Sequence, residues 1–137
     1  MNVRADLVTR WFQEVWCEPR NPDAIDELLA DDARIFGVDA SAPITKADFR
    51  GIRDRLLASI PDLRIEVTDQ VATDDRVAFR ARATGTHAET GRPVSFAGSG
   101  IVDFEGGQVI ESHETWDFAT MLIQIGALEA EVLGAAL

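Results

Sequence analysis

The chain has 137 residues, 46% of them hydrophobic and 27% charged, which is typical of a single soluble globular domain. Its formal net charge of −11 argues against nucleic acid and anionic membrane surfaces as partners, because both attract clusters of Lys and Arg. Cys17 is the only cysteine, so an intrachain disulfide is excluded, and no stretch reaches the roughly 18 apolar residues of a membrane span. We therefore expect a cytoplasmic protein with one domain over residues 1–137.

Helical spacing of apolar residues characterises the first part of the chain. From Leu7 to Trp16 the apolar residues recur on one face, which predicts a first helix with two indoles on that face. Asn21, followed by proline and aspartate, predicts the start of a short second helix. Thr45 with an aspartate three residues later resembles a capping box, and the apolar pattern behind it predicts a third helix that ends at Pro61.

Alternating patterns follow, and they predict strands over Leu63–Thr68, Val77–His87, Val94–Phe104 and Gln108–Asp117, with a return to helical spacing over Met121–Leu128. The order predicts an α+β fold: a cone of three N-terminal helices packed on a curved antiparallel sheet of four or more strands, with a short C-terminal helix. A helix layer does not fill the whole concave side of such a sheet. We therefore expect an apolar pocket between them.

Three stretches resemble those of a known family: Ile60–Arg64, Gly85–Arg92 with its Gly-Thr-His and Thr-Gly-Arg triplets, and Gly106–Gly126 with its Gly-Gly-Gln-Val-Ile-Glu and Trp-Asp motifs. Their order and spacing resemble the SnoaL-like polyketide cyclases of the nuclear transport factor 2-like superfamily. The resemblance implies a single SnoaL-like domain with an acid/base active site in the cone, without metal or organic cofactor. It also implies a small hydrophobic substrate.

The same resemblance implies a role for Asp117, at the end of the last predicted strand. It would abstract a proton from a poly-β-ketone ester, and the resulting enolate would close a ring by intramolecular aldol attack. The position of His113 carries Trp or His in similar proteins, so His113 is the second candidate catalytic residue.

Alternation on the last strand places His113 and Asp117 on one parity, about 13 Å apart along a straight strand. They are too far apart for a direct hydrogen bond, but the pair could flank a large substrate. Burial among Trp116, Phe118 and Phe96 would raise the pKa of Asp117 and make it a useful base. The structural alternatives are that Asp117 caps the helix that follows it and that His113 has a neighbouring hydrogen-bond partner.

Substrate contacts are expected from Trp16, Phe36, Phe96, Trp116 and Arg82, of which Trp16 could stack on a flat substrate. Two histidines without paired-ligand spacing favour no metal site. The chain contains no tyrosine, which disfavours a ketosteroid isomerase oxyanion hole.

Arg80 and Arg82 share one face of a strand, with Asp103 and Glu114 as candidate partners. We expect them on a solvated face. If they pointed inward, an Asp-Arg-Asp cluster would suggest water activation like that of limonene epoxide hydrolase. A non-catalytic domain that binds a ligand or partner through the same cone is the other alternative, and packing of the convex sheet face on a second copy would give a homodimer.

Overall fold

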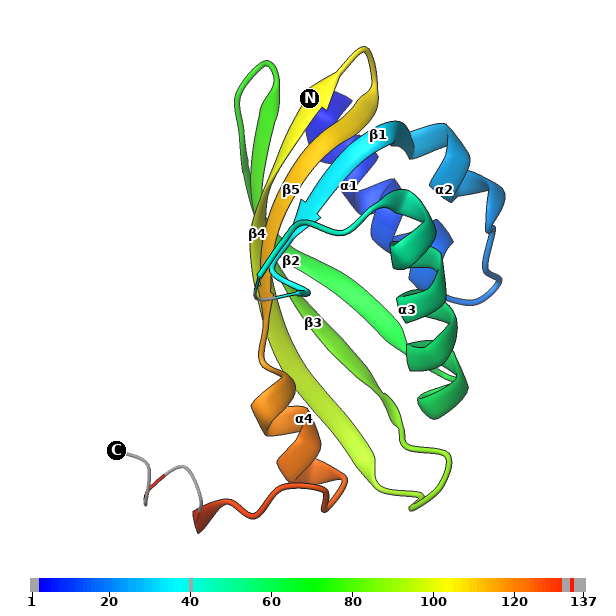
Figure 1. Ribbon diagram of the computed structural model, residues 1–137, viewed down its shortest axis with the longest axis vertical. Coiled ribbons are helices and arrows are strands. Elements are labelled where there is room, and N and C mark those ends of the chain that lie inside the picture. The colour runs from blue at the N-terminus through cyan, green and yellow to red at the C-terminus, as the bar shows by residue number, and fades with distance from the viewer. Residues whose placement is uncertain (1–2, 40, 132–133, 135–137) are drawn as a thin grey trace.

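The computed structural model describes residues 3–39, 41–131 and 134, and in these residues a curved sheet is covered on its concave side by helices (Figure 1). The five strands of the sheet lie in the order β1-β5-β4-β3-β2. The strands are β1 (Leu29–Phe36), β2 (Arg64–Ala72), β3 (Arg76–Thr86), β4 (Pro93–Glu105) and β5 (Gln108–Trp116), and the helices are α1 (Val3–Trp11), η1 (Phe12–Trp16), α2 (Asp23–Leu28), α3 (Lys46–Ser59) and α4 (Phe118–Gln124).

The predicted α+β class is confirmed, and the four predicted strands correspond to β2, β3, β4 and β5, which pair antiparallel. The expectation of a wholly antiparallel sheet is wrong, because β1 lies between α2 and α3 in the chain and pairs parallel with β5. The burial of β1 does not alternate regularly, since Asp31 and Asp32 interrupt it where its register with β5 shifts. This irregularity obscured the strand in the sequence.

The N-terminal helical region also differs in detail from the prediction. The first helix is α-helical only to Trp11 and continues as the π-helix η1, whose wider turn brings Phe12, Val15 and Trp16 into the core. The carbonyl of Val15, at the end of this turn, accepts a hydrogen bond of 2.9 Å from Nε of the buried Arg53 on α3. Arg53 thereby ties the end of η1 to α3.

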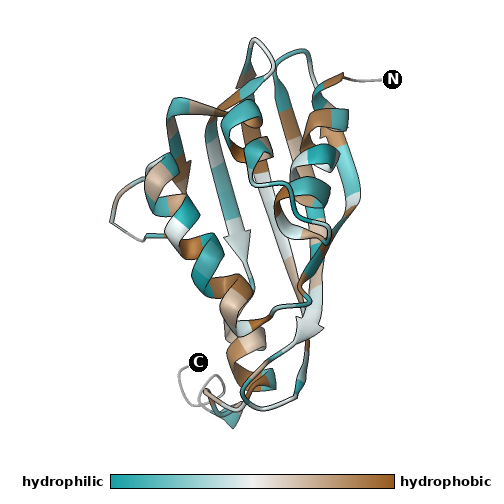
Figure 2. Ribbon diagram, turned by 90° about the vertical axis from the view of Figure 1, so that its right-hand side faces the viewer, coloured by the Kyte–Doolittle hydropathy of each residue, from teal (hydrophilic) through white to brown (hydrophobic). Residues whose placement is uncertain are grey.

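Helix α3 begins and ends where the sequence predicts. The Thr45 side chain accepts a hydrogen bond from the backbone of Asp48, and the Asp48 side chain accepts one from Thr45, so both halves of the capping box form. In Figure 2, which faces the helical side, apolar residues gather in the last turns of α3. The core below these helices contains, as its largest fully buried side chains, Ile25, Leu29, Ile60, Leu63, Val15 and Val77.

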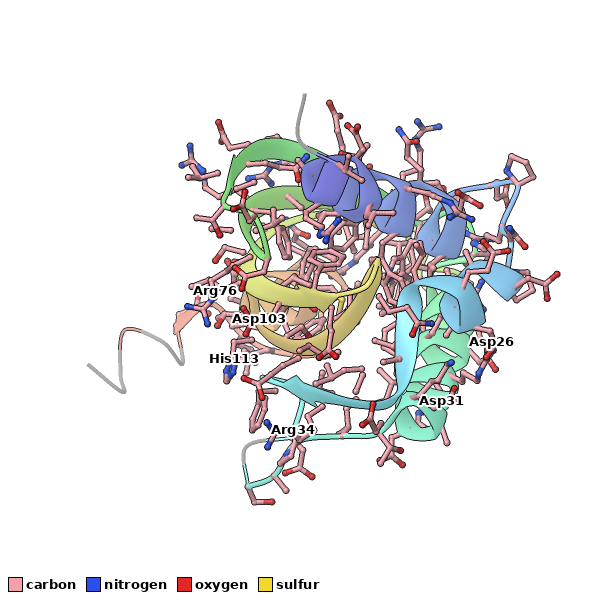
Figure 3. All side chains as sticks on the ribbon, turned by 90° about the horizontal axis from the view of Figure 1, so that it is seen from above. Asp26, Asp31, Arg34, Arg76, Asp103 and His113 are labelled. Atoms are coloured by element: carbon pink, nitrogen blue, oxygen red, sulfur yellow. The ribbon has the colours of Figure 1, made fainter. Side chains whose placement is uncertain are left out.

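The opposite face of the sheet carries mostly polar side chains. Viewed from above, Arg34, Arg76, Asp103 and His113 lie at the outer side of the sheet, away from the helices (Figure 3). Ile101 also lies on this face and is 44% exposed. The predicted homodimer, which would cover this face, stays a prediction. Within residues 3–39, 41–131 and 134, no helix is both long and apolar enough to cross a membrane.

Candidate active site

Two apolar chambers lie between the helices and the sheet, and both are lined by Trp11, Phe12, Ile35, Phe49 and Glu114. The upper chamber, under α1 and α2, has a volume of about 30 Å³, and the lower chamber, toward α3 and α4, has about 90 Å³. The shared residues form a waist between them. Since ligand pockets typically measure about 300–1,000 Å³, a polycyclic molecule requires the aromatic side chains at this waist to move.

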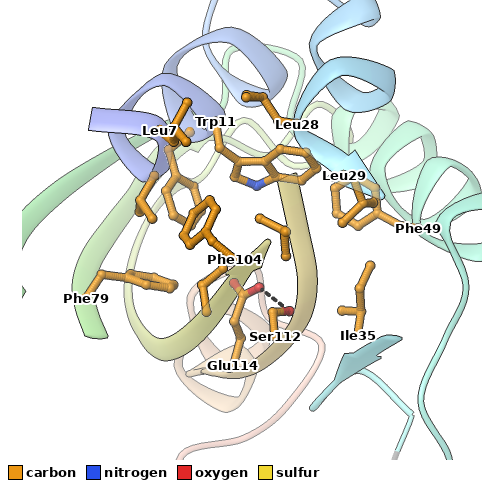
Figure 4. Close-up of a pocket in the computed structure, with 14 residues that line it drawn as sticks. Leu7, Trp11, Leu28, Leu29, Ile35, Phe49, Phe79, Phe104, Ser112 and Glu114 are labelled. Atoms are coloured by element: carbon orange, nitrogen blue, oxygen red, sulfur yellow. Dashed lines mark hydrogen bonds between the residues drawn. The ribbon is translucent and has the colours of Figure 1, made fainter. Parts of the chain in front are cut away.

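The remaining lining residues are almost all apolar. In the upper chamber they are Leu7, Val8, Leu28, Leu29, Phe79, Val102, Phe104, Val109 and Ser112 (Figure 4). In the lower chamber they are Trp16, Gly37, Val38, Ile52, Leu56, Leu63, Ile65, Ala83, Phe96, Trp116 and Phe118. Val38 and Phe118 are 46% and 40% exposed, so they mark where the lower chamber approaches the surface.

Glu114, on β5, is the ionisable residue that lines both chambers. Its Oε1 accepts a hydrogen bond of 3.2 Å from the indole Nε1 of Trp116, and its Oε2 accepts one of 3.1 Å from the hydroxyl of Ser112. Burial raises the pKa of Glu114 above its ordinary value of 4.5, and the two hydrogen bonds oppose that shift only in part. A carboxyl group with a raised pKa is better suited to take up and return a proton than an ordinary glutamate.

The sequence-based choice of inward parity on β5 was wrong, and a bulge explains why. Between β4 and β5 the register shifts, so that Asp103 pairs with Glu111 whereas Phe104 pairs with Val109. Ile110 is the extra residue, and beyond it the even-numbered positions of β5 face the helices. Glu114 therefore lies inside, where the sequence analysis had placed the odd-numbered residues.

Asp117 is exposed and lines neither chamber, so its expected burial is wrong. Its carboxylate caps α4: Oδ1 accepts a hydrogen bond of 3.0 Å from the backbone N–H of Thr120, and Oδ2 accepts one of 2.6 Å from the Thr120 hydroxyl. These bonds lower the pKa of Asp117 instead of raising it. The capping alternative considered in the sequence analysis describes its position.

His113 also lies outside the two chambers, on the outward face of β5. Its ring stacks on Phe36 with centroids 4.4 Å apart, and its Nε2 lies 3.1 Å from Oε2 of Glu111. Phe36, expected to contact the substrate, therefore packs against His113 on the outer face instead of lining the cone. The alternative that His113 has a neighbouring partner is confirmed.

Of the other predicted substrate-contacting residues, Trp16, Phe96 and Trp116 line the lower chamber. Arg82 does not, because it lies exposed on the outer face of β3 and donates a 3.0 Å hydrogen bond to the hydroxyl of Ser95. Three of the four predicted aromatic residues thus line a chamber, whereas Phe36 and Arg82 do not. Contact with a substrate stays a prediction.

Of the charged residues considered for epoxide hydrolysis, Arg80, Arg82 and Asp103 also lie outside, and only Glu114 lines the chambers. Arg80 pairs with Asp69 at 2.7 Å, and Asp103 pairs with Arg76 at 2.5 Å, all on the solvated side of the sheet. The inward Asp-Arg-Asp cluster is therefore not formed by these residues. In the part of the chain that the structure describes, no group of three or more His, Cys, Asp or Glu side chains is placed to hold a metal ion.

One feature of the sequence could have identified Glu114. Gly98 and Gly100 lie two residues apart on β4, and glycine inside a strand often marks a close approach by another group. Gly98 pairs with Trp116 and Gly100 pairs with Glu114. These two glycines leave room for the two side chains that form the carboxyl site.

Comparison with known proteins bears on the family and the fold. The family model of the SnoaL-like polyketide cyclases matches residues 6–125. The crystal structure of IdmH, a proposed polyketide cyclase from Streptomyces antibioticus, is 28% identical and has a TM-score of 0.79, covering 89% of this chain and 97% of that one. AclR, a proposed hydroxylase from Streptomyces galilaeus, is 25% identical with a TM-score of 0.75, covering 98% of this chain and 87% of that one.

A third structure, a proposed SnoaL-like polyketide cyclase from Jannaschia sp. CCS1, is 21% identical with a TM-score of 0.78 over 92% of this chain and 93% of that one, and it bears on the fold alone. Comparison with curated proteins gave no match. The family model spans most of the chain, from α1 to the end of α4. The protein therefore belongs to the SnoaL-like polyketide cyclase family.

Proposed function

We propose that the protein is a cofactor-independent acid/base enzyme that acts on a hydrophobic carbonyl compound, with Glu114 as the proton-transferring residue. The observation that carries this proposal is a single carboxyl group between two apolar chambers, with its pKa raised by burial. A pKa shifted toward neutrality suits a group that must be a base in one step and an acid in the next. Family membership supports the same reaction class.

The proposed reaction is an intramolecular aldol ring closure. The Glu114 carboxylate removes a proton from a carbon that lies between two carbonyl groups, and the electron pair of the broken C–H bond forms an enolate. The enolate carbon then attacks a second carbonyl carbon of the same molecule, so that a C–C bond forms and the attacked C=O becomes an alkoxide. Glu114 returns its proton to the alkoxide, and the enzyme ends in its starting state.

The apolar lining supports a neutral, hydrophobic substrate. Apart from Glu114, none of the residues that line the two chambers is charged, so an anionic substrate would lose its hydration without gaining a partner. Trp16, Phe96 and Trp116 offer flat apolar surfaces on which a ring system can pack.

A panel of hydrophobic β-keto esters in deuterium oxide tests the proposal. Proton NMR follows the exchange of deuterium into the carbon between the carbonyls, which requires only the first step. We expect Glu114→Gln to lower the exchange rate by about a hundred- to ten-thousandfold. The matched control is Asp117→Asn, which removes the other candidate carboxylate, keeps a capping residue and should exchange at the wild-type rate.

If Asp117→Asn abolishes exchange and Glu114→Gln does not, the assignment to Glu114 is wrong. If the wild-type protein binds members of the panel without exchanging any of them, the non-catalytic alternative is favoured: a domain that binds a hydrophobic ligand in the same cone. Titration of the tryptophan fluorescence would detect such binding, because Trp11, Trp16 and Trp116 all line the chambers.

A further inference from the structure

The two groups that donate hydrogen bonds to Glu114 differ in whether they can also accept one. An indole N–H can only donate, whereas a serine hydroxyl can donate or accept. Trp116 bonds Oε1 and Ser112 bonds Oε2, so each oxygen has its own partner. When Glu114 is protonated, the indole N–H can donate only to the oxygen without the proton. The hydroxyl of Ser112 can instead rotate and accept a hydrogen bond from the acid O–H.

Packing fixes the indole of Trp116 in place. Its ring lies over Gly98 on β4, so closely that a methyl group at that position would overlap it. Phe12 and Phe96 contact the ring edgewise, with centroids at 6.0 and 6.2 Å. A donor held this firmly does not follow a proton from one oxygen to the other.

No other titratable group competes for the carboxyl among the residues that line the chambers from α1, η1, α2, β1, α3, β3 and β4. The buried guanidinium of Arg53 on α3 donates to the carbonyl of Val15. The outward residues Glu111 and His113 on β5 pair with each other on the far side of the sheet. The two neutral donors are thus the polar partners of Glu114.

We propose that Trp116 and Ser112 are positioning residues: Trp116 keeps Oε1 of Glu114 as a permanent acceptor, and Ser112 follows the exchangeable proton on Oε2. The carboxyl then has one fixed oxygen and one proton-transferring oxygen. The catalytic significance of this division rests on the proposed function. The division itself is a property of the protein without substrate.

Infrared spectroscopy of the substrate-free protein tests the proposal. The carboxylic acid C=O band of Glu114 is identified as the band that is missing from Glu114→Gln. In the neutral acid Oε1 is the carbonyl oxygen, and a hydrogen bond from the indole lowers its stretching frequency. We expect Trp116→Phe to move the band to a higher wavenumber and Ser112→Ala to leave it nearly in place, because Ser112 bonds the other oxygen.

The pKa of Glu114, followed by the loss of this band with pH, is the second readout. We expect it to rise in both variants, because the carboxylate loses a donor, and to rise more in Trp116→Phe. In Ser112→Ala the neutral acid also loses an acceptor, which offsets part of the effect. A merely structural role for Trp116 would move neither the band nor the pKa in this order.

A second probe of Trp116 does not depend on the stability of the phenylalanine variant. In wild-type protein, the indole ¹H–¹⁵N resonance of Trp116 should shift as Glu114 ionises, those of Trp11 and Trp16 should shift less, and Glu114→Gln should abolish the dependence. The proposal would be overturned by a larger band shift in Ser112→Ala than in Trp116→Phe. It would also be overturned if the indole resonance of Trp116 did not shift as Glu114 ionises. Since neither measurement uses a substrate, failure of the deuterium exchange assay would leave this result standing, and the reverse also holds.

Discussion

Adding one methyl group at Gly100 should destabilise the protein and disturb its carboxyl site together. A Cβ atom there would lie 2.7 Å from Cγ of Glu114, 2.7 Å from the backbone oxygen of His113 and 3.0 Å from Cε1 of Phe79. The backbone oxygen belongs to the neighbouring strand and cannot turn aside as a side chain can. Strand β4 or the Glu114 side chain therefore has to shift in Gly100→Ala.

The size of the effect follows from two opposing contributions. Overpacking costs about 1–3 kcal/mol in general and, because a backbone atom is in the way here, we take the upper part, about 2–3 kcal/mol; the lower entropy of the unfolded chain with alanine returns about 0.5–1 kcal/mol. We expect a net loss of about 1–2 kcal/mol in the free energy of unfolding, which lowers the Tm of a domain of this size by about 4–8 °C. Thermal unfolding followed by circular dichroism measures the shift.

Gly51 on α3 provides the matched control. A Cβ atom at this position would meet only the side chain of Arg55, at 3.7 Å, and alanine is a far better helix residue than glycine. Gly51→Ala should raise the stability by about 0.5–1 kcal/mol. Equal stability changes in the two variants, or a neutral Gly100→Ala, would refute the close packing of Glu114 against β4 on which the site depends.

Three further predictions concern the carboxylates and the helix cap. Glu114→Gln should be more stable than wild type at neutral pH but not below pH 4.5, the ordinary pKa of glutamate. Because the pKa of Glu114 is raised in the folded state, the wild type loses stability as the pH rises from 4.5 through the folded-state pKa. Urea unfolding across this pH range measures the difference. Asp117→Ala should keep the exchange activity within about twofold of wild type but lose the stability that the ionised cap provides above pH 3.8, the ordinary pKa of aspartate. The wild type loses this same stability as the pH falls through the lowered folded-state pKa of Asp117. Parallel activity and unfolding curves separate the two effects. Thr45→Ala should cost about 1 kcal/mol by removing the acceptor for the backbone N–H of Asp48, and a similar loss from Thr45→Ser would show that the hydroxyl is not what matters.

Local patterns were sufficient for most of the fold. The capping box at Thr45 and the stop at Pro61 predicted α3, and alternation predicted the four strands from β2 to β5, because both signals depend on residues close together in the chain. Helical spacing placed Trp16 and alternation placed Phe96 on faces that line the lower chamber, whereas the inward position of Trp116 did not follow from the parity chosen for β5. The predictions for Trp16 and Phe96 needed no information about the residues on neighbouring elements.

Tertiary structure decided which carboxyl group lines the chambers. Alternation along β5 allows either parity to face inward, and the choice depends on the bulge opposite Phe104, which is a property of two paired strands and not of one. Because of this shift of one residue, Glu114 and Ser112 line the chambers, whereas Asp117 and His113 do not. The parallel strand β1 escaped prediction for a related reason, since its pairing with β5 joins segments far apart in the chain.

The amino-acid sequence by itself thus determined α3, the strands β2 to β5 and the α+β class, and it indicated the family, because periodicity, caps and turns are encoded within a few residues of one another. The burial of each side chain, and with it the direction of its pKa shift, depends on how the curved sheet packs against the helices. Asp117 follows β5 and is exposed, and its hydrogen bonds from Thr120 lower its pKa, whereas Glu114, three residues earlier, lines the chambers and burial raises its pKa. Two carboxyl groups three residues apart thus have pKa values shifted in opposite directions by their surroundings.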